Sequence, residues 1–158
     1  MPYIIDGHNL IPKVPGLSLS AVDDEMQLVE QLQEFCRLQR KSAEVYFDNA
    51  APGFPASQRF GLVTVRFVRR GMSADVAIRN RLYKLGKSAR NWTVVSSDLA
   101  VQFAARTAQA NHIASDEFAR SLVETLRSAG EGQAERPDVH LTTEEVNEWL
   151  EIFKRRKQ

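Results

Sequence analysis

The first eleven residues, MPYIIDGHNLI (1–11), place a polar DGHN segment between two apolar stretches. The run Tyr3–Ile5 has no polar alternation, which is typical of a strand buried on both faces of a parallel sheet. Asp6 follows directly and would therefore lie at the carboxyl end of that strand. Because ligands bind at this edge of open α/β sheets, we expect the Asp6 carboxylate to take part in a site there.

Alternating strand and helix patterns continue along the rest of the chain. Apolar runs predict strands at about 3–5, 43–49, 62–67, 93–98 and 112–113. Apolar residues at helical spacing predict helices at about 21–41, 74–85, 99–108, 115–126 and 142–156. The proline- and glycine-containing segment 51–61 predicts a loop. This order favours an α/β fold, a three-layer α/β/α sandwich with a mostly parallel sheet.

The chain of 158 residues fits a single domain, 1–158, with a core at about 3–126 and a C-terminal helix at about 142–156. A domain of this size buries roughly 70% of the surface that its unfolded chain exposes. The lone cysteine, Cys36, cannot form an internal disulfide, so we expect a buried, inert thiol and a reducing, cytoplasmic environment. The apolar runs are too short to span a bilayer, which argues against membrane insertion.

Four aspartates recur at comparable places in this pattern. Each of three strands runs into an aspartate, and a fourth lies in or beside the first turn of the helix after the third strand: Asp6, Asp48, Asp98 and Asp75. Taken one at a time, an aspartate after a strand can also be a helix cap or a turn residue. If the sheet is parallel, however, all four converge on one edge.

Carboxylates gathered at one edge would repel each other unless a divalent cation neutralised them. Oxygen ligands without a Cys or His cluster favour Mg²⁺ or Mn²⁺ over zinc, and such an ion can activate water for attack on a phosphodiester. Asn9 could hold the Asp6 carboxylate, a metal-bound water or a phosphate, and His8 is a weaker candidate for substrate contact. No glycine-rich fingerprint follows the first strand, so a nucleotide cofactor is not expected.

Charge is distributed unevenly, although the net charge is only +1. Residues 51–90 contain nine basic side chains and one acidic side chain, whereas 1–50 and 91–158 carry net charges of −4 and −3. A solvated helix face, which is the alternative, usually mixes both signs, so the one-sided block favours a surface that binds a polyanion. Its candidate phosphate-binding residues are Arg69, Arg70, Arg79 and Lys84.

Five segments in this order, IIDGHNLI, VYFDNA, GMSADVAIRNRL, VVSSDLAVQFAA and SDEFARSL, resemble the YacP-like NYN-domain ribonucleases, a branch of the PIN-like nucleases. The resemblance implies a PIN-like sandwich whose acidic edge binds Mg²⁺ or Mn²⁺. It implies catalytic roles for four residues and a less constant metal-binding role for a fifth: Asp6, Asn9, Asp75 and Asp98, with Asp48. The family commonly has paired acids where Ala74-Asp75-Val76 offers one carboxylate, which leaves the number of metal ions open.

The resemblance also implies RNA as the substrate. The family includes a bacterial endoribonuclease that cuts messenger RNA on the ribosome, so the ribosome is an implied partner. Two hypotheses follow. The first is a metal-dependent endoribonuclease, and the second is a non-catalytic RNA-binding or ribosome-associated module on a nuclease fold. Only the carboxylates separate them, because a pure binder of a polyanion gains nothing from negative charges beside its binding face.

Overall fold

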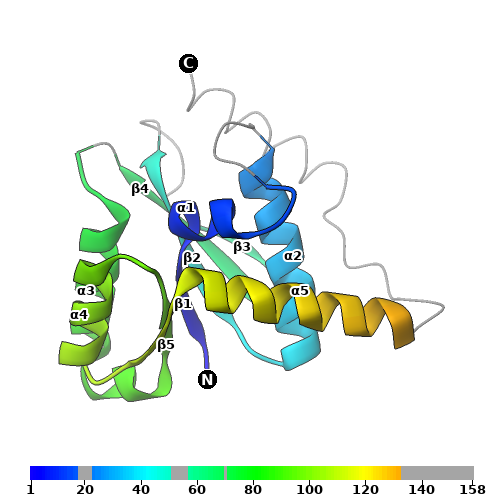
Figure 1. Cartoon of the computed structure of the whole chain (residues 1–158). Helices are drawn as coiled ribbons and strands as arrows, with labels where there is room; N and C mark the ends of the chain where they lie inside the picture. The colour runs from blue at the N-terminus through cyan, green and yellow to red at the C-terminus, as the bar shows by residue number, and fades with distance from the viewer. Residues whose placement is uncertain (18–22, 51–56, 70, 133–158) are drawn as a thin grey trace.

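A six-stranded sheet forms the centre of the molecule (Figure 1), in a computed structural model that describes residues 1–17, 23–50, 57–69 and 71–132. Its strands are β1 (Tyr3–Asp6), β2 (Ala43–Ala50), β3 (Ser57–Phe60), β4 (Val63–Arg69), β5 (Thr93–Val95) and β6 (Asn111–Ile113). Their order across the sheet is β3-β4-β2-β1-β5-β6. All neighbouring pairs are parallel except β3 and β4. The expected α/β fold with a mostly parallel sheet is confirmed.

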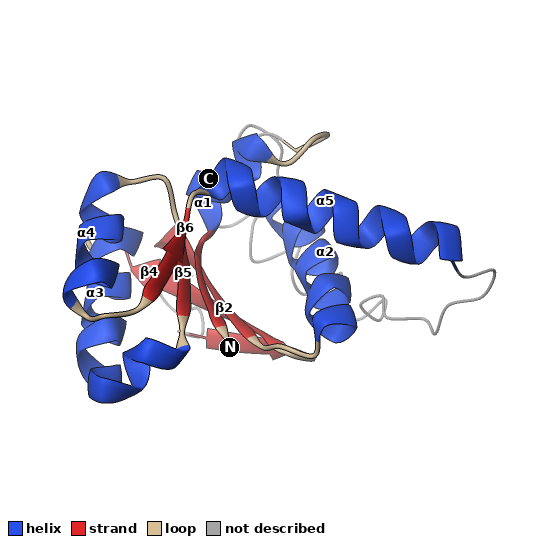
Figure 2. Ribbon diagram, turned by 60° about the horizontal axis from the view of Figure 1, so that its bottom comes forward, coloured by secondary structure: helices blue, strands red, loops and turns tan. Residues whose placement is uncertain are grey.

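Helices cover both faces of this sheet (Figure 2). They are α1 (Gly7–Leu10), α2 (Asp24–Gln39), α3 (Ala74–Leu85), α4 (Leu99–Thr107) and α5 (Ser115–Gly132), with short 3-10 turns η1 (Ile11–Lys13) and η2 (Gly86–Asn91). Helices α2 and α5 pack on one face, and α3 and α4 pack on the other. Because neighbouring residues of a strand point to opposite faces, Ile5 packs in the core beneath α2 and α5, and Ile4 packs in the core beneath α3 and α4.

Helix α2 illustrates how the apolar spacing creates a layer. Leu28, Leu32 and Phe35 recur on one face of the helix and are buried against the sheet and α5. The helix ends at Gln39, and Arg40, which caps it, adopts a left-handed conformation with a φ of 55°. Cys36 lies within this core, as expected, and burial raises the pKa of its thiol to about 12.

The DGHN segment forms the short helix α1 directly after β1, and its glycine permits that packing. A Cβ atom at Gly7 would lie 2.4 Å from the Phe47 ring and 2.9 Å from the Tyr46 carbonyl oxygen. Only glycine therefore fits between β1 and β2 at this point. The close approach brings the residues after Asp6 against the carboxyl end of β2.

Three expectations differ from the structure. Residues 57–60 of the predicted loop form the edge strand β3, because the turn at Gly61 (φ 61°) lets it pair with β4 and bury Phe60. Strand β5 ends at Val95 rather than at Asp98. Helix α5 continues to Gly132 rather than ending near residue 126. The predicted helix at about 142–156 lies outside the described residues, as do residues 21 and 22 of the helix predicted at about 21–41. Among the helices described, none is long and apolar enough to cross a membrane.

The direction of the connections changes between β1 and β5, which lie side by side in the sheet. The chain leaves β1 toward α2 on one face of the sheet and leaves β5 toward α4 on the other face. The carboxyl ends of two parallel strands whose connections diverge in this way form a topological switch point, where open α/β proteins bind ligands. Asp6 ends β1 and Asp98 follows β5, so both lie at this switch point.

Candidate active site

Asp6 is the most perturbed carboxylate at the carboxyl edge. Asp6 is 8% exposed, and its Oδ2 accepts a hydrogen bond from Ser96 Oγ at 3.3 Å. Burial and, next, the negative charge of Asp48 raise the pKa of Asp6 from 3.8 to about 6, although Ser96, the Asn9 backbone N–H and His8 act to lower it. The site therefore holds a buried carboxylate beside a second negative charge, an arrangement that a bound cation would stabilise.

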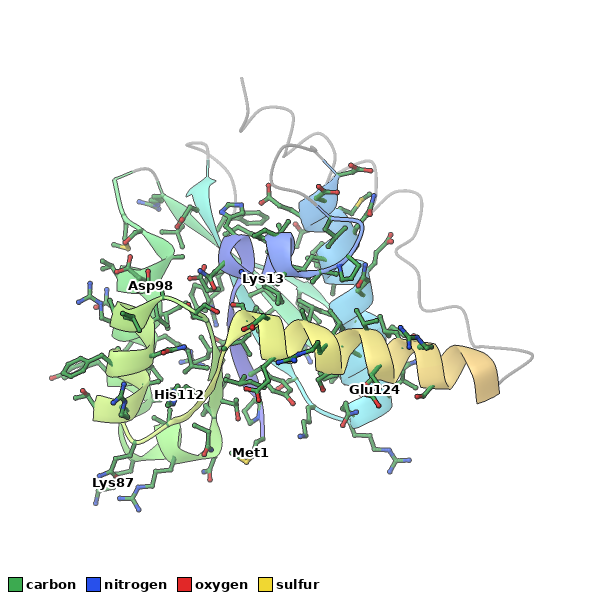
Figure 3. The ribbon with its side chains drawn as sticks, in the orientation of Figure 1. Met1, Lys13, Lys87, Asp98, His112 and Glu124 are labelled. Carbon is green, nitrogen blue, oxygen red and sulfur yellow. The ribbon has the colours of Figure 1, made fainter. Side chains whose placement is uncertain are left out.

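Ser96 connects the ends of β1 and β5. This residue is fully buried, and its Oγ donates to Asp6 while accepting the Asp98 backbone N–H at 3.0 Å. Asp98 in turn caps α4, because its Oδ1 accepts the Ala100 N–H at 2.8 Å. Asp98 is thus both a helix cap, the alternative that its position suggested, and an exposed carboxylate at the start of α4 (Figure 3).

Asn9 ties three connections together at the same edge. Its side-chain oxygen accepts hydrogen bonds from the Ser97 N–H at 2.8 Å and from Ser115 Oγ at 2.6 Å. Ser97 lies between β5 and α4, and Ser115 begins α5. The Asn9 oxygen is therefore engaged in holding the loops, and the contact that Asn9 makes with the Asp6 carboxylate comes from its backbone N–H.

Asp48 and Asp75 meet at the start of α3. Oδ1 of Asp48 accepts a short hydrogen bond from the Ala74 N–H, so this carboxylate holds the first turn of α3 against β2. Asp75 accepts a hydrogen bond from Ser73 Oγ and pairs with Arg79 at 3.5 Å. A hollow of about 460 Å³ opens beside Asp48, lined also by Gly71, Met72, Ser73 and Val76.

His8 has a structural setting that the sequence did not indicate. Its Nε2 lies 3.1 Å from Oε2 of Glu25, a buried residue of the first turn of α2, and its Nδ1 accepts the Asp48 backbone N–H at 3.4 Å. The imidazole therefore links α1 to both α2 and β2. Neither contact is visible from sequence spacing, because Glu25 and Asp48 are brought to His8 only by the packing of α2 and β2.

The predicted carboxylates share one edge but do not form a closed cage. In the described part of the chain, no group of three or more His, Cys, Asp or Glu side chains is placed to hold a metal ion. The charge of Asp48 acts on Asp6, so these two are near neighbours. Mg²⁺ commonly takes only one or two protein carboxylates and completes its shell with water and phosphate oxygens. Asp6 and Asp48 suit that donor set, and the metal-ligand roles of all four aspartates, Asp6, Asp48, Asp75 and Asp98, stay predictions.

The predicted RNA-binding residues are distributed over β4 and α3. Arg69 is exposed at the carboxyl end of β4, and Arg79 and Lys84 are exposed on α3. Arg70 lies outside the described residues. Two further members of the basic block, Arg66 and Arg81, instead form ion pairs with Glu44, at 3.3 and 2.7 Å, so they serve the fold.

Comparison with known proteins places this geometry in a family. Residues 3–154 match the YacP-like NYN domain. The crystal structure of Rae1 (YacP) from Bacillus subtilis superposes with a TM-score of 0.70 at 22% identity, covering 83% of this chain and 78% of Rae1. A point mutant of Rae1 gives 0.67 at 22% identity, covering 82% and 79%. No curated protein matches the chain. The PIN-like sandwich is therefore confirmed as the fold.

Proposed function

The chain belongs to the YacP-like NYN domain family, which is a nuclease family, and on that premise we propose that it is an endoribonuclease that depends on Mg²⁺ or Mn²⁺. The substrate is RNA, and messenger RNA on the ribosome, in the cytoplasm, is the setting that we propose for it. The observation that carries the proposal is the buried Asp6 carboxylate beside the charge of Asp48, at the carboxyl end of β1.

Each polar residue of the edge has a distinct role in this proposal. Asp6 and Asp48 hold the cation, and Asp75 and Asp98 extend the negative edge around it. A bound Mg²⁺ or Mn²⁺ supplies an activated water and stabilises the charge that develops on the phosphate. Ser96 orients Asp6, because its hydroxyl proton is donated to Oδ2 of that carboxylate. Asn9 keeps the three loops at fixed positions through Ser97 and Ser115.

The basic residues complete the site by neutralising the substrate. Phosphates that approach four carboxylates are repelled unless cationic side chains lie nearby, and Arg69, Arg79 and Lys84 are exposed beside the edge or along α3. Arg70 has the same proposed role from its position in the sequence. These side chains bind the RNA backbone without reading its bases.

The decisive experiment measures cleavage of a mixed RNA pool with Mn²⁺ or with EDTA. We expect cleavage only with the metal. Asp6→Asn keeps the shape of the side chain but removes its charge, so cleavage should slow at least about a hundredfold, which corresponds to about 3 kcal/mol of barrier. RNA binding should persist, since one repelling charge is gone. Glu124→Gln, the same chemical change on the exposed surface of α5, should cleave at the wild-type rate (Figure 3).

The alternative function is RNA binding without catalysis. It is favoured by one observation, that the described residues hold no group of three or more acidic, His or Cys side chains placed to hold a metal. If the wild type binds RNA but cuts none with Mn²⁺, on or off ribosomes, or if Asp6→Asn cuts as fast as the wild type, the binding module replaces the nuclease as the better description.

A further inference from the structure

The outer surface of the α3–α4 layer exposes three large apolar side chains. Tyr83 on α3 is 88% exposed, and Leu99 and Phe103 on α4 are 78% and 67% exposed. Tyr83 and Phe103 line a hollow of about 490 Å³ between the two helices, together with Arg79, Leu82, Ala104 and Thr107. We call this hollow the α3–α4 groove. The exposed rings of Tyr83 and Phe103 contribute little to the core, so their position on neighbouring helices indicates a binding surface.

The charge around the α3–α4 groove indicates the chemistry of that ligand. Residues 74–108 contain six basic side chains and only two acidic ones. Both acidic residues, Asp75 and Asp98, lie at the N-terminal ends of α3 and α4. Arg79, Lys84 and Arg106 are exposed on the same two helices farther along. A ligand that carries both negative charge and flat apolar surfaces matches rings surrounded by cations, whereas a purely apolar partner does not.

Arg79 connects the α3–α4 groove to the candidate active site. Arg79 lines the groove and also pairs with Asp75, so one side chain contacts both places. A helix rises about 1.5 Å per residue, which puts Tyr83 about 12 Å along α3 from Asp75 and Phe103 about 7 Å along α4 from Asp98. Asp98 and Lys87 lie at opposite ends of this layer (Figure 3). A chain leaving the carboxylates can therefore follow the layer toward its cationic end.

We propose that the α3–α4 groove is a base-stacking subsite for single-stranded RNA, in which Tyr83 and Phe103 stack on bases beside the cut and Lys84, Lys87 and Arg106 hold the phosphates. This subsite deepens the proposed function and rests on it. Aromatic rings stack on the faces of bases only when the bases are free of a duplex, and every base has such a face. The subsite is therefore selective for unpaired RNA and tolerant of sequence.

Binding of a short fluorescein-labelled RNA, followed by anisotropy in EDTA so that no cleavage occurs, tests the subsite. Tyr83→Ala and Phe103→Ala should each weaken binding about tenfold, while Tyr83→Phe, which keeps the ring, should bind like the wild type. The salt dependence of RNA binding should be the same for these ring variants as for the wild type. Lys84→Ala and Lys87→Ala should each lower the log–log salt slope by about 0.7. Melting temperatures should not move, because the rings are exposed.

Two ligand controls separate stacking from charge. An oligonucleotide of the same length with abasic nucleotides keeps the phosphates and removes the bases, so the two alanine variants should bind it as well as the wild type does. A duplex of the same sequence should likewise show no difference. Leu62→Ala, which truncates an exposed apolar side chain at the β3–β4 turn, should not change affinity for any of these ligands.

Each contrary result has a defined meaning. If the wild type binds and cuts RNA while Tyr83→Ala and Phe103→Ala bind single strands undiminished, the subsite is overturned and the nuclease proposal stands. If those variants instead abolish self-association in sedimentation without affecting RNA affinity, the α3–α4 groove is an interface between copies and the subsite is overturned. If the wild type neither binds nor cuts RNA, the proposed function fails and the subsite fails with it.

Discussion

Two regions of the same sheet bury a carboxylate, and they treat it in opposite ways. Under α3, Glu44 of β2 receives two hydrogen bonds from Arg81, at 2.9 and 2.7 Å, with further contacts from Tyr46 and Arg66. Burial acts to raise the pKa of Glu44, but Arg81, helped by Tyr46 and Arg66, lowers it below its usual value. At the carboxyl edge, burial and the neighbouring charge of Asp48 raise the pKa of Asp6 to about 6.

The difference indicates that Glu44 has a structural role, whereas Asp6 is a candidate for a functional one. Glu44 is satisfied within the chain, and its negative charge helps to fix α3 to the sheet. Asp6 is as deeply buried, yet its strongest charged neighbour has the same sign. The folded chain gains no stability from such an arrangement, and the divalent cation of our proposal would offset the two negative charges. Four predictions test the contrast between the two regions.

Arg81→Ala should have the largest effect on stability. It leaves Glu44 buried without its main partner and also removes the guanidinium that lies 5.4 Å from the Trp92 ring. We expect a loss of about 3 kcal/mol of unfolding free energy in urea titrations at pH 7. Arg79→Ala, two residues earlier on α3, removes a half-exposed partner and should cost no more than about 0.5 kcal/mol. Equal losses would remove the distinction between buried and exposed pairs.

Asp6→Asn should have the opposite sign and stabilise the metal-free protein. The rise from 3.8 to about 6 corresponds to roughly 3 kcal/mol, and water at the edge reduces this to an expected gain of about 2 kcal/mol at pH 7. Because the folded pKa is raised, the wild type keeps the contribution of Asp6 below about pH 4 and loses it as the pH rises through 6. The unfolding free energy of Asp6→Asn, measured by urea titration, should therefore increasingly exceed that of the wild type as the pH rises from about 4 to 6. A parallel pH profile would contradict the perturbed pKa.

Glu44→Gln should destabilise the protein by about 1.5 kcal/mol at pH 7, because hydrogen bonds to a charged group are lost or weakened. The lowered pKa of Glu44 means that its contribution is present above the unfolded pKa of about 4.5 and disappears as the pH falls through the folded value. The cost of the substitution should thus shrink in acid, measured by urea titration from pH 7 downward. A cost that stays constant with pH would show that packing, not charge, is responsible.

Metal binding should give the smallest change of the four. Mn²⁺ at ten times its dissociation constant stabilises the folded state by about 1.4 kcal/mol, which a thermal melt detects as a higher melting temperature. Asp6→Asn should abolish that rise, whereas Glu44→Gln should retain it, because Glu44 takes no part in the site. The same response to Mn²⁺ in Asp6→Asn as in the wild type would place the ion elsewhere.

Much of the fold could be predicted because its signals are local. The parallel strands were expected from apolar runs such as Tyr3–Ile5, and α2 was expected from the helical spacing of Val29, Leu32 and Phe35. The edge strand β3 was missed, because its pairing depends on β4 and the turn at Gly61 rather than on its own polar sequence, SQRF.

The candidate site likewise has features that the sequence predicted and features that it did not. The sequence by itself determined that Asp6, Asp48 and Asp98 follow buried strands and reach one edge, since strand direction and alternation are encoded residue by residue. Only the tertiary structure decided that Ser96 joins Asp6 to Asp98, that Asn9 ties the loops, and that Arg81 neutralises Glu44 across 37 positions of the chain. Those contacts depend on strand order and on the packing of α3, and no local pattern carries that information.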